Sequence, residues 1–323
     1  MAHHSGHLAP REAANAGAIR LTPRMGHAKA GAMETSETME APAPPPATGP
    51  ALKAKRSRKR KKEGVAETTR FLLLLFLFAV LLRSFVVAPF SIPSGSMLPR
   101  MMIGDYLFVA KWSYGYSRVS LPFGLGSFDG RLLAREPERG DVAVFRYPDG
   151  SDEDYVKRVI GLPGDQVQMQ EGVLYLNGEA VPRVRVADFL MPITPNSPCR
   201  TIDPAAARVV TDREGSRFCA YPRYRETLPE GRSFYVLDQI QGPTDDTPVY
   251  IVPDDHYFMM GDNRDDSEDS RIALEAGGVG YLPADYLIGE ALITFFSTDG
   301  SAEWLKPWTW FSAARWERIG DTY

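Results

Sequence analysis

Residues 154–165 read Asp154-Tyr155-Val156-Lys157-Arg158-Val159-Ile160-Gly161-Leu162-Pro163-Gly164-Asp165, a β-rich run that ends in a turn sequence. Similar short β-rich runs lie between clusters of Pro, Gly, Asn and Asp at residues 106–110, 141–145, 173–176, 257–260 and 291–296. Short strands separated by frequent turn signals are typical of an all-β sandwich or barrel. The pair Asn177-Gly178 is a hairpin signal within residues 174–181. The sequence therefore predicts a mainly β domain.

Residues 181–249 are more irregular and richer in Pro and Arg than the runs on either side. They predict an inserted smaller subdomain or long loops between two parts of the β domain, 91–180 and 250–300. Both cysteines, Cys199 and Cys219, lie here. A disulfide between them would close a loop of about 20 residues and stabilise the fold by roughly 3 kcal/mol in the chain-entropy model. Two free buried thiols are the alternative.

An uninterrupted apolar run covers residues 71–82 and resumes at 85–88. About twenty residues at about 1.5 Å each span a hydrocarbon core of about 30 Å, so we predict one transmembrane helix at 66–90. Eight of the ten residues at 53–62 are Lys or Arg. By the positive-inside rule this block stays cytoplasmic, and the chain beyond about residue 90 lies on the other side of the membrane.

Two other interpretations of this region are weaker. A cleavable signal peptide is disfavoured because Pro89 follows the possible cut site at 86–88. The basic block also resembles nucleic-acid-binding patches, but the apolar run that follows favours a membrane flank, so we expect no nucleic-acid partner. Residues 1–52 are rich in Ala and Pro, and with the basic block they predict a disordered cytoplasmic tail at 1–65.

The charge distribution supports this division. The chain carries a net charge of −4, and removing the +8 of the basic block leaves −12 for the rest. The average therefore combines a strongly basic cytoplasmic segment with an acidic exported part.

Histidine is scarce, and this excludes several catalytic designs. Only His256 lies beyond residue 27, so a Ser-His-Asp triad would have to use it, and a His-rich zinc site is excluded. Two cysteines are too few for a zinc site made of four thiolates. A hydrolase with this sequence would use a lysine or a carboxylate as its base. We expect no metal and no cofactor.

A serine-bearing turn comes directly after the apolar run. Residues 92–99 read Ile-Pro-Ser-Gly-Ser-Met-Leu-Pro, in which two prolines fix the backbone and Gly95 permits a sharp turn. A serine on such a turn can present its hydroxyl together with its own N–H, as a nucleophile with an oxyanion donor would. An ordinary linker is the alternative.

The run at 154–165 holds two adjacent cations. In a strand, Lys157 shares a face with Tyr155, and Arg158 lies on the opposite face. Only the lysine can readily lose its proton, and to act as a base its pKa must fall from about 10.4 by about 2–3 units. A surface lysine is the alternative, and Lys111 is a weaker competitor for the role.

A polar segment at 261–271 reads Gly-Asp-Asn-Arg-Asp-Asp-Ser-Glu-Asp-Ser-Arg. Its spacing is not that of an EF-hand, and its two arginines would repel calcium. It is either a self-bonding turn or a hydrogen-bonded scaffold with an Arg–carboxylate pair that supports a neighbouring site.

Together these segments resemble the type I signal peptidases of bacteria, membrane-bound serine endopeptidases that remove signal peptides from exported preproteins. The resemblance covers most of residues 90–300 and is carried by four motifs in order: Ser94-Gly95-Ser96-Met97-x-Pro99; Arg139-Gly140-Asp141-Val142; Tyr155-Val156-Lys157-Arg158 with Gly161-Leu162-Pro163-Gly164-Asp165; and Met260-Gly261-Asp262-Asn263-Arg264-Asp265 with Ser267, Ser270 and Arg271. It implies a mostly β catalytic domain with an apolar surface resting on lipid.

The resemblance also implies catalytic roles. Ser96 would be the nucleophile and Lys157 the general base. The Ser94 hydroxyl and the Ser96 N–H would form the oxyanion hole, and Ser267 would orient the Lys157 amine.

The same resemblance implies residues for support and for substrate binding. Asp269 and Arg271 would form a pair beneath the site. Shallow pockets for small substrate residues would be lined by Phe90, Ile92, Tyr155 and Val156.

Two other functions stay open: a specialised processing peptidase of one secretion or conjugation system, and a non-catalytic membrane-anchored binding module. Four of the five tryptophans lie in the C-terminal segment 301–323, at 304, 308, 310 and 316. They predict either an anchor at the membrane interface or an aromatic cluster packed on the sheet. We expect preproteins and membrane lipid as partners, and a monomer.

Overall fold

The computed structural model describes residues 54–121, 128–200, 208–303 and 305–323. The expectations for the tail at 1–52 and for Trp304 lie outside the described residues, as do the side chains of the basic block. The chain divides into two units, 1–59 and 60–323, and the second contains every strand that the structure describes.

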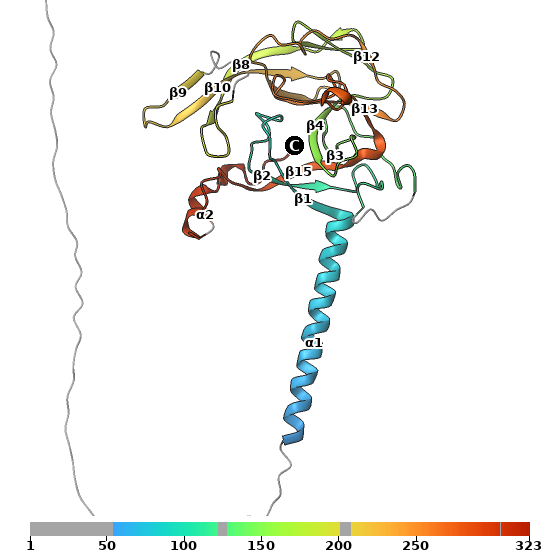
Figure 1. Ribbon diagram of the computed structural model, residues 1–323, viewed down its shortest axis with the longest axis vertical. Helices are drawn as coiled ribbons and strands as arrows, with labels where there is room; N and C mark the ends of the chain where they lie inside the picture. Colours follow the sequence, from blue (N-terminus) through green and yellow to red (C-terminus); the bar gives the residue numbers. More distant parts are fainter. Residues whose placement is uncertain (1–53, 122–127, 201–207, 304) are drawn as a thin grey trace, which may run out of the picture. The chain divides into compact units, whose positions relative to one another are not determined.

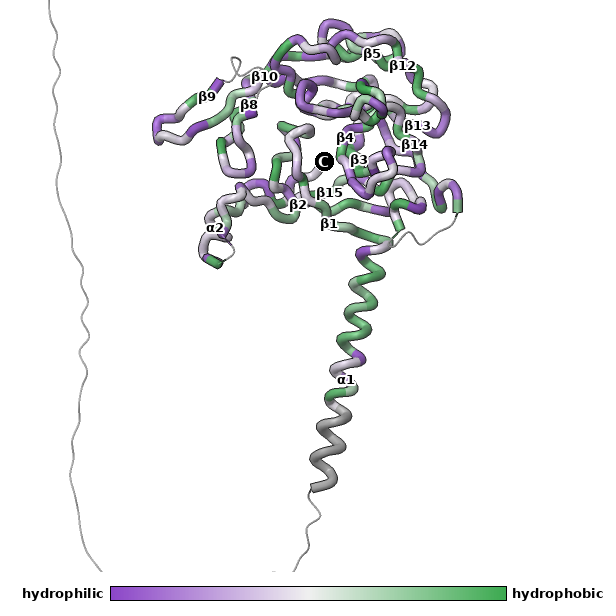
Figure 2. Tube along the Cα trace, in the orientation of Figure 1, coloured by the Kyte–Doolittle hydropathy of each residue, from purple (hydrophilic) through white to green (hydrophobic). Residues whose placement is uncertain are grey.

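A long helix, α1 (Ala54–Leu81), carries the apolar run and continues as a short π-helix, η1 (Leu82–Val86). The segment Gly64–Val86 is long and apolar enough to cross a membrane. The side chains of Phe71 to Phe78 are each at least half exposed, and Figure 2 shows the hydrophobic residues concentrated in the part of α1 that leads to β1. These side chains do not pack into a protein core. A helix that is apolar and exposed in this way is what contact with lipid requires.

The helix ends earlier than the predicted residue 90. Val87 already belongs to a strand, β1 (Val87–Ser91), which pairs with β2 from Val87 opposite Ala110. The β-branched Val86 and Val87 disfavour the helix, and Pro89 pushes the residue before it toward extended geometry. The last residues of the apolar run therefore join the sheet.

A seven-stranded antiparallel sheet forms the centre of the domain (Figure 1). Its strands in spatial order are β1, β2 (Asp105–Ala110), β15 (Leu287–Ser297), β3 (Val142–Arg146), β4 (Asp154–Gly161), β13 (His256–Met260) and β14 (Tyr281–Pro283). The six β-rich runs of the sequence all fall on strands, five of them in this sheet. The mainly β prediction is confirmed.

A small sheet adjoins it, ordered β12 (Tyr250–Ile251), β5 (Gln166–Gln170), β6 (Val173–Leu176) and β7 (Glu179–Ala180). The turn between β6 and β7 is Asn177-Gly178, and both residues have positive φ (54° and 85°). A two-residue turn of this kind matches the twist of a hairpin, and the predicted hairpin is confirmed.

Residues 181–249 contain long strands, so the long-loop alternative is wrong for its described part. The strands are β11 (Ser233–Leu237), β10 (Arg217–Thr227), β8 (Arg183–Pro192) and β9 (Arg208–Thr211), with β10 paired to the other three. Most residues of β8 and β9 are not buried, so these strands lack the buried apolar face that gives clear alternation in the sequence. The structure joins Cys199 to Cys219 of β10 in a disulfide, with Cα atoms 5.4 Å apart.

The C-terminal segment contains a short helix, α2 (Trp308–Ala313). The last third of the chain also contains three short 3₁₀ turns: η4 (Leu274–Ala276), η5 (Ala284–Tyr286) and η6 (Trp316–Arg318). The Arg318 guanidinium lies 2.6 Å from Asp105 of β2, an ion pair that fastens the segment to the large sheet. Trp308 and Trp316 nevertheless stay 69% and 57% exposed. They are therefore not packed on the sheet, which disfavours the aromatic-cluster alternative.

Candidate active site

The Ser96 turn is fixed by its own apolar residues. The Leu98 N–H donates to the Gly95 carbonyl at 3.1 Å and the Met101 N–H to the Met97 carbonyl at 2.9 Å, which closes a helical turn. Met97 and Met101 are fully buried in a core cluster shared with β2, β3 and β15. Because these two side chains hold the turn from one side, Ser96 faces a neighbouring cavity on the other.

Strand β4 brings Lys157 to the same place. Lys157 pairs across the sheet with Ala143 of β3, a small residue, and its side chain is almost completely buried at 4% exposure. Its Nζ donates to the Ser96 Oγ at 2.7 Å. Two residues 61 positions apart in the sequence are therefore in direct contact.

The charge of Lys157 is poorly compensated. Burial lowers the pKa of Lys157 to about 8, against a partial opposing effect from the carboxylates of Asp269 and Glu268, while Arg271 lowers it further. Lys157 has no carboxylate within ion-pair distance among the described residues. An amine with this pKa is neutral in roughly one molecule in ten at pH 7, far more often than an ordinary lysine with a pKa of about 10.4.

The loop 261–271 holds the serine turn in position. The Asn263 N–H donates to the Ser96 carbonyl at 2.9 Å, and the Asn263 side chain donates to the Gly95 carbonyl at 3.1 Å. Gly261 is required by the close approach: a Cβ there would lie 2.2 Å from the Ser267 Oγ and 2.7 Å from the Ser96 carbonyl oxygen. The glycine and the asparagine therefore lock two distant segments together.

Asp269 and Arg271 pair as expected. The Arg271 Nε and Nη2 donate to the two Asp269 oxygens at 2.9 Å each, and the Gly261 N–H donates to Asp269 at 3.0 Å. Burial alone would raise the pKa of Asp269, but the charge and hydrogen bonds of Arg271 lower it. Since Arg271 also donates to the Arg264 carbonyl at 2.6 Å, the pair closes the loop on itself beneath Lys157.

Ser267 differs from the expectation. It lines the cavity, but its buried hydroxyl has no hydrogen-bond partner in the described part of the chain. The Lys157 amine is directed at Ser96 instead, and the Ser267 side chain packs against the backbone of Gly261. The expected hydrogen bond from Ser267 to the amine is therefore absent from this structure.

The expected oxyanion donors lie beside the nucleophile. The exposed Ser94 hydroxyl is 3.4 Å from the Ser96 Oγ. The Ser96 N–H donates to no acceptor within the described ranges, so it is available to a ligand. A hydroxyl and a free N–H at one point can together bind a developing negative charge on oxygen.

The cavity that Ser96 faces has a volume of about 550 Å³. It is lined by Ser94, Ser96 and Lys157, by all four predicted pocket residues (Phe90, Ile92, Tyr155 and Val156), and by Val144, Ile272 and others. Val144 and Ile272 were missed by the sequence reasoning. Val144 reaches the wall because it pairs with Val156 across β3 and β4, a register that the sequence does not reveal.

The competing candidates lie elsewhere. The Lys111 Nζ donates to the Ser120 carbonyl at 2.6 Å, and Lys111 does not line the Ser96 cavity. His256 is the first residue of β13, at the end away from the loop 261–271, and its Nδ1 lies 2.8 Å from the Asp254 carbonyl oxygen. His256 does not line the Ser96 cavity either. Lys157 is therefore the base candidate that the fold brings to Ser96.

Comparison with known proteins gives a consistent result. The family described as signal peptidase, peptidase S26, matches residues 65–296. The chain is 38% identical over 229 residues to the signal peptidase I of Rickettsia prowazekii, covering 68% of this chain and 76% of that protein. It is 37% identical over 232 residues to the signal peptidase I of Rickettsia akari, covering 68% and 75%.

A solved structure of a signal peptidase I from Enterococcus faecalis is also similar, at 24% identity over 48% of this chain and 97% of the other. Its TM-score of 0.25 is too low for the two folds to be compared in detail.

Proposed function

The chain belongs to the signal peptidase family, peptidase S26, whose members cleave signal peptides from preproteins, and we propose that Ser96 is its nucleophile and Lys157 its general base. Membership in the family makes the chain a serine peptidase that acts on preproteins. The observation that carries the residue assignment is the contact of 2.7 Å between the Lys157 Nζ and the Ser96 Oγ, in a site where burial lowers the lysine pKa to about 8.

The first half of the reaction forms an acyl-enzyme. A neutral Lys157 amine accepts the proton of the Ser96 hydroxyl, and the Ser96 Oγ attacks the carbonyl carbon of the scissile peptide bond. The electron pair of the carbonyl moves to its oxygen, where the Ser96 N–H and the Ser94 hydroxyl stabilise the negative charge. When the carbonyl re-forms, the peptide C–N bond breaks, the Lys157 ammonium protonates the leaving amine, and the mature protein departs.

The second half releases the signal peptide. The amine of Lys157, neutral again, takes a proton from a water molecule, and the water oxygen attacks the ester carbon. The ester C–O bond breaks, and Lys157 returns the proton to the Ser96 Oγ. Each proton that Lys157 takes is passed to a leaving group, so Ser96 and Lys157 end the cycle in the states in which they began it.

A cleavage assay with purified full-length variants tests the assignment. Ser96→Ala and Lys157→Met are each expected to lower kcat/KM by at least about 10³-fold on a preprotein with Ala-x-Ala before its cut site. The matched control is Lys111→Met, which removes another buried lysine that is hydrogen-bonded away from Ser96. Activity near wild type in either site variant, or loss only in Lys111→Met, would contradict the dyad.

The topology is also a proposal. We infer that α1 spans the membrane with residues 1–65 on the cytoplasmic side, supported by the exposed apolar side chains of Gly64–Val86 and the basic block before them. The exposed Trp308, Phe311 and Trp316 would add contact with lipid at the membrane interface. Protease treatment of intact spheroplasts should digest the β domain and spare an epitope placed before residue 53; the reverse pattern contradicts this orientation.

A further inference from the structure

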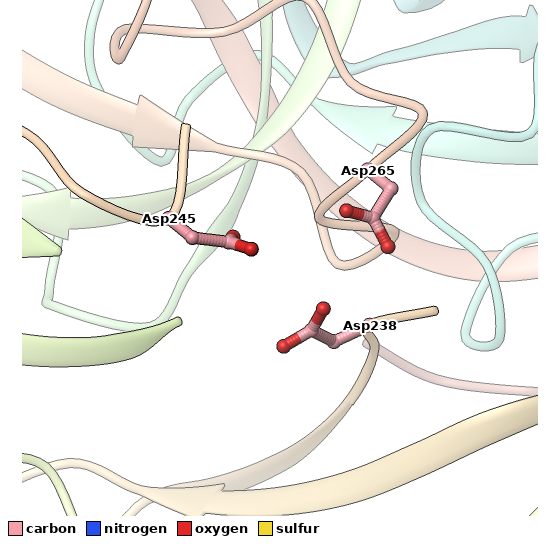
Figure 3. Close-up of side chains that lie close together, drawn as sticks. All are labelled: Asp238, Asp245 and Asp265. Carbon is pink, nitrogen blue, oxygen red and sulfur yellow. The ribbon is translucent and has the colours of Figure 1, made fainter. Parts of the chain in front are cut away.

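Three aspartates from separate segments converge behind the catalytic loop (Figure 3). Asp238 follows β11, Asp245 lies in the connection from β11 to β12, and Asp265 belongs to the loop 261–271. One carboxylate oxygen of each lies within 4.8 Å of the others. Asp265 also lines the Ser96 cavity, but none of the three aspartates has a role in the chemistry proposed for peptide cleavage.

Each carboxylate is positioned through one oxygen and leaves the other unused. The Oδ2 of Asp238 pairs with the guanidinium of Arg183, the Oδ2 of Asp245 accepts the Gly242 N–H at 2.8 Å, and the Oδ2 of Asp265 accepts backbone N–H groups of residues 239 and 240. The three Oδ1 atoms accept no hydrogen bond from any residue that the structure describes. The protein therefore fixes the orientation of three carboxylates while leaving an oxygen of each available.

The Oδ1 atom of Asp245 is an independent sign that a ligand binds here. Asp245 is only 3% exposed, and this oxygen is buried without a partner within the described ranges. In Figure 3 its carboxylate points toward the other two. A buried carboxylate oxygen without a partner is strongly unfavourable, and three carboxylates so close repel one another.

Charge and size indicate what would satisfy the cluster. Three carboxylates carry −3 and the ion-paired Arg183 contributes +1, so the cluster has a net charge of −2. Arg271 acts on Asp245 and Asp265 through space: its hydrogen bonds go to Asp269 and Arg264, and its Nη1 has no hydrogen-bond partner among the described residues. Oxygens within 4.8 Å of one another can share one Ca²⁺, since calcium–oxygen bonds of about 2.3–2.6 Å place opposite ligands about 5 Å apart.

The surroundings leave room for the ion. Two glycines border the cluster: a Cβ at Gly172 would lie 3.1 Å from the Asp238 Oδ2, and a Cβ at Gly242 would lie 3.7 Å from the Asp265 Oδ1.

We propose that Asp238, Asp245 and Asp265 form a structural site for one Ca²⁺, completed by water. The ion ties the catalytic loop, through Asp265, to the connection that follows β11. It takes no part in the cleavage chemistry, so the site stands or falls independently of the Ser96–Lys157 assignment.

The test is calcium binding to the full-length protein in detergent micelles after removal of metal with EDTA. Isothermal titration with CaCl₂ should give one ion per chain with a Kd of about 1 mM or tighter, as for extracellular calcium modules. The unfolding midpoint should rise by about 2–4 °C in 10 mM CaCl₂ relative to NaCl of equal ionic strength. No binding at millimolar Ca²⁺, or equal midpoints in the two salts, overturns the proposal.

Two variants locate the site. Asp245→Asn should weaken binding at least tenfold and abolish the calcium-dependent shift, whereas Asp246→Asn, the exposed neighbour on the same loop, should retain both. In EDTA, Asp245→Asn should unfold at or above the wild-type temperature because it removes one of three repelling charges. Equal calcium binding by Asp245→Asn and wild type overturns the assignment, as does equal loss in Asp246→Asn.

Discussion

The two faces of β4 carry two buried cations with opposite surroundings. Lys157 and Arg158 are adjacent and almost equally buried, at 4% and 5% exposure. Arg158 donates to both oxygens of Asp262, at 2.8 and 2.6 Å, and stacks over the Phe234 ring. Lys157 has a serine hydroxyl as its hydrogen-bond acceptor and no ion-paired carboxylate among the described residues.

The difference shows that the partner, more than the depth of burial, decides what a buried cation does. A bidentate carboxylate compensates the guanidinium charge and makes Arg158 a fixed part of the structure. Without such a partner, burial disfavours the charged amine, so the same depth makes Lys157 a group that can give up its proton. Three predictions test this contrast.

The largest change in stability is expected for the ion pair between Arg158 and Asp262. Asp262→Asn leaves the Arg158 guanidinium buried without a counter-charge, and the free energy of unfolding should fall by about 3–5 kcal/mol. The control is Asp152→Asn, which breaks a pair with Arg146 at a fully exposed carboxylate and should change stability by less than about 1 kcal/mol. Chemical denaturation measures both, and equal effects would contradict the contrast.

A change of opposite sign is expected at Lys157, which has no ion-pair partner among the described residues. Lys157→Met removes a buried charge that nearby carboxylates compensate only in part, so at pH 7 the variant should be more stable than wild type by about 1–3 kcal/mol.

The pH dependence of this gain follows from the lowered pKa. Below pH 8 the lysine is protonated in both states, so the folded protein bears the full penalty of burying the charge. Above pH 8 the folded state loses the proton and the penalty shrinks, until it vanishes near the unfolded pKa of about 10.4. The variant's advantage should therefore decline between pH 8 and 10.4. A gain that stays constant with pH would show that packing, not charge, is responsible.

The smallest effect concerns the pH profile of cleavage. Since only neutral Lys157 can accept the Ser96 proton, kcat/KM should rise about tenfold per pH unit below pH 8 and level off above it. Glu268→Gln removes a charge that raises the lysine pKa, and should move the profile to lower pH. Two results together would show that Lys157 does not accept the Ser96 proton: a wild-type kcat/KM that is constant from pH 6 to 9, and the same profile in Glu268→Gln.

Local patterns explain what could be predicted. The β-rich run of β4 and the Asn177-Gly178 turn are short-range signals, and the structure places strands and hairpin there. The strands β8 and β10 were not predicted because arginines and a proline interrupt them and one face stays in solvent. The missing Ser267 hydrogen bond and the wall residue Val144 depend on loop packing and strand register, which leave no local trace.

By itself the sequence determined the apolar span, the mainly β class, and the scarcity of histidine that left a lysine or a carboxylate as the candidate base. These are properties of composition and short-range spacing. The motif resemblance already named Lys157 over Lys111 as the base; the tertiary structure alone decided how closely Lys157 meets Ser96, that Arg158 takes the Asp262 carboxylate, and that three aspartates far apart in the chain converge. The physical reason is that pKa and ion pairing depend on distance and burial, and both arise only when the sheet has brought distant segments together.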